Sequence, residues 1–167
     1  MPTYTFDSDD LLKQYADGVI HLKETIAGLS AIELDTALHD HNWTIRQIVH
    51  HVVDGDDLWK TCIKAALGSN EAFSMNWYWD ISQDIWADVW QYAKRDVEPG
   101  LRLLQANREH TLQLLRLKPK ALEQEVIVRW PDGEEQKWTI GDVIKDQVAH
   151  VIGHIEEIHT IRSTYGF

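Results

Sequence analysis

Two histidines near the C-terminus, His150 and His154, have the spacing of a metal-binding pair. On an α-helix, residues four apart lie one turn apart on the same face, so both imidazoles can reach one divalent ion. A tight site needs at least one more ligand, and the sequence offers His51 as the third. The alternative is that these histidines only border the core, because a lone His-x₃-His pair is common on helices that bind no metal.

Three imidazoles that bind one ion would form a metal site with an open coordination position. Neutral imidazole suits zinc, nickel, copper and iron, and three protein ligands leave a coordination position open for water or substrate, which is typical of catalytic sites. A bound zinc ion lowers the pKa of a coordinated water to about 7 and holds a thiol as thiolate. We expect one divalent metal per chain, with zinc first and nickel, manganese or iron as alternatives. A di-iron centre needs two Glu-x-x-His units, and only Glu156-x-x-His159 is present.

The helix that carries His51 is predicted to begin after Thr44 and to end at Gly68. Thr44 and Gln47 match a capping box, in which the hydroxyl and the amide satisfy free N–H groups of the first turn. On a helical wheel of about 100° per residue, His51 lies at the edge of the apolar stripe and His50 lies nearly opposite it. We therefore expect His51 to border the core and His50 to face water.

The last predicted helix repeats this opening, with Trp138-Thr139-Ile140 matching Trp43-Thr44-Ile45. The repeat suggests two equivalent helices of a bundle, each anchored by its tryptophan. On the wheel, His154 lies about 60° and His150 about 100° from the centre of the apolar stripe, on the same side. His159 falls on the opposite flank, so we exclude it from the pair.

The remaining elements complete an all-α architecture. A first helix is expected after Asp7 or Ser8 and ends near Gly28, and a connector over 30–42 holds one helical turn. A third long helix runs from about Val97 to the residue before Pro119. Alternating apolar residues on either side of a turn over 131–133 predict a β-hairpin before the last helix. The fold is thus a four-helix bundle with a small hairpin, in a single domain of 167 residues.

Composition excludes several classes of partner. Asp and Glu number 27 against 16 Lys and Arg, a formal charge of −11, which disfavours nucleic acid and anionic membranes. No apolar run approaches the about 20 residues that span a bilayer. The single cysteine, Cys62, cannot form an internal disulfide, and no segment typical of a signal peptide precedes Ser8, so a cytoplasmic location is expected. We interpret Cys62 as a small buried residue rather than a nucleophile.

Tryptophans gather in the least regular segment, 69–96, as Trp77, Trp79, Trp86 and Trp90. Trp86 and Trp90 are one turn apart on a short helix predicted over about 81–93. These rings can cover an open end of the core, or they can form one wall of a ligand pocket, since pockets are mostly apolar and aromatic. All four are therefore candidate pocket residues.

Two motifs resemble the DinB/YfiT-like superfamily of metal-dependent four-helix-bundle proteins. The similarity covers nearly the whole chain and comes closest to the YfiT-like branch, which includes bacillithiol transferases. It rests on His150-x₃-His154 and on an earlier run, Trp43-Thr44-Ile45-Arg46-Gln47-Ile48-Val49-His50-His51-Val52-Val53-Asp54. The resemblance implies an up-down-down-up bundle, metal ligands at His51, His150 and His154, a homodimer, and the use of a low-molecular-weight thiol such as bacillithiol, mycothiol or glutathione. The segment from Ser69 to Trp79, which includes Asn76-Trp77-Tyr78-Trp79, departs from the family pattern, so the substrate is the least transferable property.

Three functions remain open for such a site. In a thiol-dependent S-transferase, the metal holds the cofactor thiol as thiolate and presents it to an electrophilic small molecule. In a hydrolase, an activated water takes the place of the thiol. In a non-catalytic stress-response module, the histidines only tie two helices together. No catalytic side chain is identified, although Gln147 shares a side of the helix with His150 and His154 and is a candidate to support them.

Overall fold

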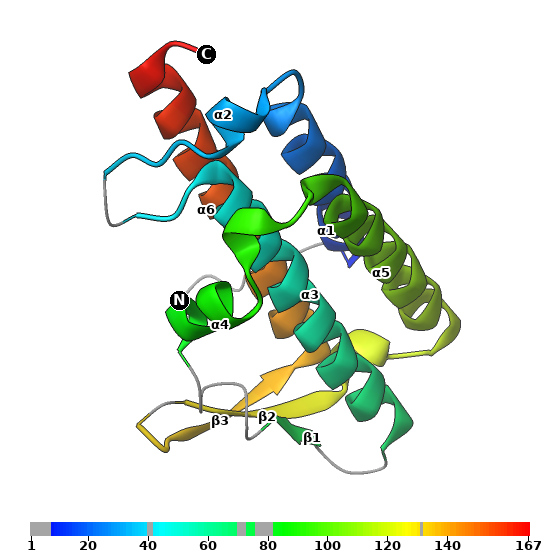
Figure 1. Ribbon diagram of the computed structural model, residues 1–167. Helices are drawn as coiled ribbons and strands as arrows, with labels where there is room; N and C mark the ends of the chain where they lie inside the picture. Colours follow the sequence, from blue (N-terminus) through cyan, green and yellow to red (C-terminus); the bar gives the residue numbers. More distant parts are fainter. Residues whose placement is uncertain (1–7, 40–41, 70–72, 76–81, 131) are drawn as a thin grey trace, which may run out of the picture.

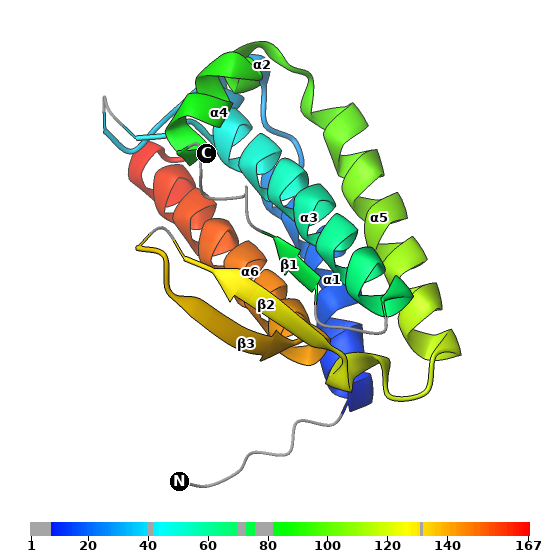
Figure 2. The same cartoon turned by 90° about the horizontal axis from the view of Figure 1, so that it is seen from below.

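Four long helices pack side by side, and two of them carry the three candidate ligands (Figure 1). The computed structural model describes residues 8–39, 42–69, 73–75, 82–130 and 132–167. The long helices are α1 (Ser8–Ile26), α3 (Ile45–Gly68), α5 (Val97–Leu117) and α6 (Ile140–Tyr165). α1 and α6 run in one direction and α3 and α5 in the other, which confirms the predicted up-down-down-up bundle (Figures 1 and 2). Within the described ranges, none of the helices has the length and apolarity needed to cross a membrane.

The helices α3 and α6 begin with the same local device. The Thr44 hydroxyl accepts from the Gln47 N–H at 3.3 Å, and the Gln47 side chain accepts from the Thr44 N–H at 3.0 Å. At the start of α6, the Thr139 hydroxyl accepts from the Asp142 N–H at 3.1 Å, and the Asp142 carboxylate accepts from the Thr139 N–H at 3.0 Å. Two capping boxes therefore fix where both histidine-bearing helices begin.

Two buried clusters fill the bundle, one toward the β-hairpin and one toward the opposite end. They are separated on α5 by Arg108, which lies between Leu104 of one cluster and Leu112 of the other. Each fully buried aliphatic side chain contributes about 1.5–3 kcal/mol to folding. The largest fully buried apolar residues are Tyr15, Tyr92, Leu22, Ile45, Ile48, Ile63, Leu104, Ile140, Ile144, Ile158 and Ile161. Arg108 is a buried charged side chain between two apolar clusters, so its position needs an explanation.

Short helical pieces lie in the connections from α1 to α3 and from α3 to α5. The connector after α1 contains the expected single turn, α2 (Ala31–Leu34). The short helix predicted over about 81–93 is interrupted: α4 (Gln83–Val89) ends before a 3₁₀ turn, η1 (Tyr92–Lys94). Between them Gln91 adopts a left-handed conformation with φ of 56°. This reversal turns Tyr92 into the core, where it is 1% exposed.

A small sheet covers the end of the bundle where α6 begins (Figure 1). The predicted hairpin is confirmed as β2 (Glu125–Arg129) and β3 (Glu135–Thr139), which pair antiparallel after the 3₁₀ turn η2 (Ala121–Glu123). A third strand, β1 (Phe73–Met75), pairs parallel with β2 and was not predicted. Three residues are too few to show an alternating pattern, and their partner strand lies far away in the sequence.

Candidate metal centre

The imidazoles of His51, His150 and His154 converge on one point between α3 and α6. The Nε2 atom of His150 lies 2.9 Å from Nε2 of His51 and 3.2 Å from Nε2 of His154. The three ring planes are steeply inclined to one another, with interplanar angles of 79° to 82°. Among the described residues, this is the one group of at least three histidine, cysteine or carboxylate donors close enough to hold an ion. The structure therefore brings together the three residues that the sequence singled out.

This arrangement fits a metal ion better than it fits three free imidazoles. For a tetrahedral ion with Zn–N bonds of about 2.0–2.1 Å, two ligating nitrogens lie about 3.3 Å apart, close to the two separations of 2.9 and 3.2 Å. Without an ion, His150 can donate one Nε2 proton to only one neighbour, and the remaining nitrogen lone pairs face one another. A cation at the centre removes this conflict.

Glu157 orients one of the three imidazoles. The Nδ1 atom of His154 lies 3.0 Å from the Glu157 carboxylate, so the ring donates its proton there and leaves Nε2 free. Metal-ligating histidines commonly give their second ring N–H to a carboxylate in this way. Sequence reasoning missed Glu157, although its position three residues after His154 on a predicted helix was the available signal.

The helix α3 places His51 two turns after its capping box, where the side chain is 6% exposed. The ring of Trp43, the residue before the cap, packs on the His51 ring with centroids 4.6 Å apart. Burial, with smaller effects from His150 and His154, lowers the pKa of His51 to about 3. Burial likewise lowers the pKa of His150 to about 4, with smaller effects from His154 and Arg108. Both rings are thus neutral near pH 7, the state that binds a metal.

The prediction that His50 faces water is wrong, because the side chain is completely buried. Its Nε2 atom lies 3.3 Å from the carbonyl oxygen of Arg95, and its ring lies 5.7 Å from that of Tyr92. Gly100 on α5 packs directly against it, since a Cβ there would lie 3.5 Å from His50 Nδ1. The helical wheel assumed one packed face, whereas α3 is covered by α5 and η1 on this side as well as by α6.

Comparison with known proteins identifies the family. The model of the DinB superfamily matches residues 9–158. The chain belongs to the DinB superfamily. This confirms the resemblance seen in the histidine motifs and their surroundings.

Two relatives of this DinB-superfamily chain are each named as a "Putative metal-dependent hydrolase". One, from Oceanobacillus iheyensis, is 30% identical over 104 residues, which are 62% of this chain and 58% of the relative. The other, from Geobacillus thermodenitrificans, is 25% identical over 156 residues and covers 87% of this chain and 79% of the relative. The chain thus spans little more than half of the first relative's length.

Two solved structures share the fold of this DinB-superfamily chain. YfiT from Bacillus subtilis, described as having an unusual four-helix bundle topology, superposes with a TM-score of 0.85 at 22% identity, covering 100% of this chain and 94% of YfiT. A mycothiol-dependent maleylpyruvate isomerase superposes with a TM-score of 0.69 at 13% identity, covering 95% of this chain and 63% of the isomerase. At sequence identities of 22% and 13%, these similarities establish the shared four-helix-bundle fold and nothing about activity.

The other candidate residues of this DinB-superfamily chain are Gln147 and four tryptophans. Gln147 is 2% exposed and its amide donates to Asp146 at 3.3 Å, but its buried Oε1 atom has no partner among the described residues. Trp86 is buried and stacks on the partly exposed Trp90 at 5.1 Å, an arrangement typical of a core cover. The other two pocket candidates, Trp77 and Trp79, lie outside the described residues.

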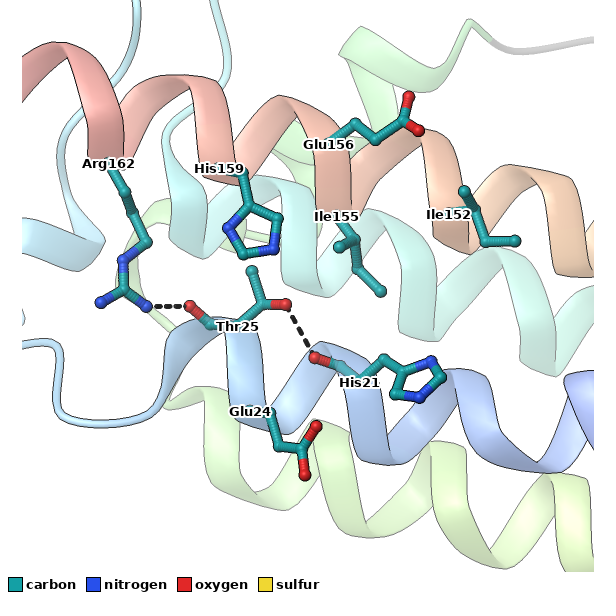
Figure 3. Close-up of a pocket in the computed structure, with 8 residues that line it drawn as sticks. All are labelled: His21, Glu24, Thr25, Ile152, Ile155, Glu156, His159 and Arg162. Atoms are coloured by element: carbon teal, nitrogen blue, oxygen red, sulfur yellow. Dashed lines mark hydrogen bonds between the residues drawn. The ribbon is translucent and has the colours of Figure 1, made fainter.

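A groove between α1 and α6 is separate from the three imidazoles (Figure 3). It has a volume of about 460 Å³, and none of the three candidate ligands lines it. His159 points into it from α6, whereas Glu156 points away from α1 (Figure 3). As predicted from the wheel, His159 therefore lies on the other flank of α6 from the His150 and His154 pair.

Proposed function

We propose that this chain is a metal-dependent enzyme that uses an open three-histidine centre on a small-molecule substrate. The convergence of the three Nε2 atoms of His51, His150 and His154 carries the proposal. We propose one divalent ion per chain, with zinc as the first choice and nickel, manganese or iron as alternatives, because imidazole ligands discriminate weakly among them. The names of the two hydrolase relatives support the metal dependence.

The attacking group comes from outside the chain in this proposal. The single cysteine, Cys62, is buried, and burial raises the pKa of its thiol to about 12, so it is not a usable nucleophile. Among the described residues, no other cysteine exists and no side chain besides the histidines and Glu157 bonds to the centre. A bound divalent ion would supply Lewis acidity that lowers the pKa of an incoming thiol or water.

The residues of the chain prepare the centre for that group. His51 and His150 are held neutral by burial, Glu157 holds the Nδ1 proton of His154, and Trp43 shields the His51 ring. For the finer reaction, we propose transfer of a low-molecular-weight thiol to an electrophile. The shared fold of a mycothiol-dependent isomerase supports a thiol, and the names of the relatives support hydrolysis as the alternative.

Metal content tests the proposal first. The chain, purified without a nickel column and reconstituted with zinc, should contain about one ion, and His51→Ala and His154→Ala should lose it. His159→Ala is the matched control, because this exposed histidine on the same helix lies outside the centre. A reconstituted wild-type chain without metal refutes the proposal.

Turnover then separates the reactions. Consumption of a thiol with the electrophile monochlorobimane, abolished by a chelator, supports the S-transferase. Chelator-sensitive cleavage of an ester or amide without any thiol supports the hydrolase. If zinc-, nickel- and manganese-loaded chains stay inactive with a panel of thiols and esters, the catalytic proposal is wrong and the centre is a non-catalytic metal module.

A further inference from the structure

Arg108 is a completely buried arginine in the middle of the bundle, with an exposed fraction of 1%. Its guanidinium reaches from α5 to each of the other three long helices. Nε donates to the Asp56 carboxylate of α3 at 2.9 Å, Nη1 donates to the Tyr15 carbonyl of α1 at 2.7 Å, and Nη2 lies 3.5 Å from the Gln147 carbonyl of α6. The guanidinium also lies over the Tyr15 ring, 4.3 Å from its centroid. One side chain thus contacts all four helices.

The space for this guanidinium is built into α1. Gly18 lies inside the helix, where glycine is less favourable than alanine. A Cβ atom at this position would lie 2.8 Å from Arg108 Nη1 and 3.5 Å from a methyl group of Val151 on α6. The missing side chain therefore lets α1 approach α6 closely and leaves room for the guanidinium between them.

Stability alone does not explain such a group. Burying an arginine and a carboxylate removes both from water, and exchange of such a pair for apolar residues is often neutral or stabilising. Apolar residues, however, have no directional contacts, whereas the planar guanidinium presents donors in a fixed fork. The pair is better suited to fixing how the helices are placed than to holding them together.

Two of the helices that Arg108 joins, α3 and α6, carry the candidate ligands. Asp56 lies five residues after His51 on α3, and Gln147 lies three residues before His150 on α6. The spacing between α3 and α6 near Arg108 therefore bears on the meeting of His51 and His150.

We propose that Arg108 is a positioning residue for the three-histidine centre, holding α3 and α6 so that His51 meets His150 and His154 before any ion binds. The inference rests on the proposed metal site. Its consequence is a preorganised centre, whose ligands need no helix movement to bind a metal. Loss of Arg108 should therefore weaken metal binding even where the fold is retained.

The test compares the wild type with the double variant Arg108→Met, Asp56→Leu, which removes both charges together. Zinc affinity is measured by competition with a chromophoric chelator, the visible spectrum of the cobalt-loaded chain reports coordination, and urea unfolding of the metal-free chain reports stability. Loss of a hydrogen-bond partner of a metal ligand costs about 10- to 100-fold in affinity. Arg108 bonds to the helices that carry the ligands rather than to a ligand, so we expect a loss at the lower end, about 10-fold, and a weaker four-coordinate cobalt spectrum.

Two further variants separate positioning from general stability. Leu115→Ala removes a buried side chain near the far end of α5, so it should lower stability but leave zinc affinity and the cobalt spectrum unchanged. Arg108→Lys keeps the charge beside Asp56 but lacks the fork, so its zinc affinity should fall between those of the wild type and the double variant.

The outcomes are distinguishable. A wild-type chain that binds no zinc refutes the proposed function itself. If the wild type binds zinc and the double variant binds it equally well with the same cobalt spectrum, Arg108 has no positioning role. Should the double variant fail to fold, Arg108→Lys decides, and an affinity equal to the wild type overturns the inference.

Discussion

Glu157 accepts a hydrogen bond from Nδ1 of His154 at 3.0 Å, one turn further along α6. The contact determines which nitrogen of the ring carries the proton, and it leaves Nε2 directed at His150, 3.2 Å away. A carboxylate in this position also raises the basicity of the imidazole toward a metal. The centre therefore depends on a fourth residue that does not itself reach the convergence point.

Glu157→Ala should weaken zinc binding about 10- to 100-fold, because the His154 ring loses both its orientation and its preferred tautomer. Glu157→Gln keeps an acceptor for the Nδ1 proton but loses the charge, so its affinity should lie between those of Glu157→Ala and the wild type. Competition titration with a chromophoric chelator measures both. Glu156→Gln is the control, since no hydrogen bond joins this neighbouring carboxylate to the three imidazoles within the part of the chain that the structure describes. Equal affinities of the Glu156 and Glu157 variants would refute the role of Glu157.

The metal-free chain should lose stability on acidification. The pKa values of His51 and His150, about 3 and about 4 in the folded chain, rise to about 6.5 in the unfolded chain. Between these values the unfolded chain binds more protons, so the free energy of unfolding falls as the pH falls from about 6.5 toward about 4. Above about 6.5 the two imidazoles contribute no pH dependence.

Urea unfolding of the metal-free chain over this range measures the effect. Each imidazole adds up to about 1.4 kcal/mol per pH unit to the slope. His51→Ala should show a shallower dependence, whereas His110→Ala, an exposed control, should follow the wild type. Parallel curves for all three chains would contradict the assignment of the slope to His51.

The sequence identified the three converging histidines because each lies on a helix with one apolar stripe and a periodic pattern. The same reasoning failed for His50, since α3 is packed against α5 and η1 as well as α6. It also gave no reason to single out Arg108, which lies in the polar run Asn107-Arg108-Glu109-His110. The buried partners of such a residue come from other helices, so only the assembled bundle reveals them.

The two capping boxes should contribute to stability separately. Thr44→Ala and Thr139→Ala should each cost about 1 kcal/mol of unfolding free energy, because the first turn of α3 or α6 loses an acceptor for a free N–H. Urea denaturation measures both losses. Thr61→Ala, at an exposed position inside α3 where the hydroxyl bonds only to a carbonyl of the preceding turn, serves as the control. Losses no larger than that of the control would show that the caps are dispensable.

Trp43 should control the solvation of His51. Its ring packs at 4.6 Å on the imidazole, and burial is the main cause of the lowered pKa of His51. In Trp43→Ala the imidazole of His51 becomes more accessible to water. The pKa of His51 in the metal-free chain should therefore rise from about 3 toward its ordinary value. Titration of the histidine ring nitrogens by nuclear magnetic resonance measures it directly.

The matched control for Trp43 is Trp138→Ala, at the equivalent place before α6. Trp138 stacks on Trp59 with ring centroids 6.3 Å apart and makes no ring contact with the three imidazoles. Its loss should therefore lower stability but leave the titration of His51 unchanged. If both variants shift His51 equally, the change reflects general loosening of the bundle; if neither does, Trp43 does not shield the ring. Only a shift confined to Trp43→Ala supports a tryptophan that covers the candidate ligand His51 two turns further along the chain.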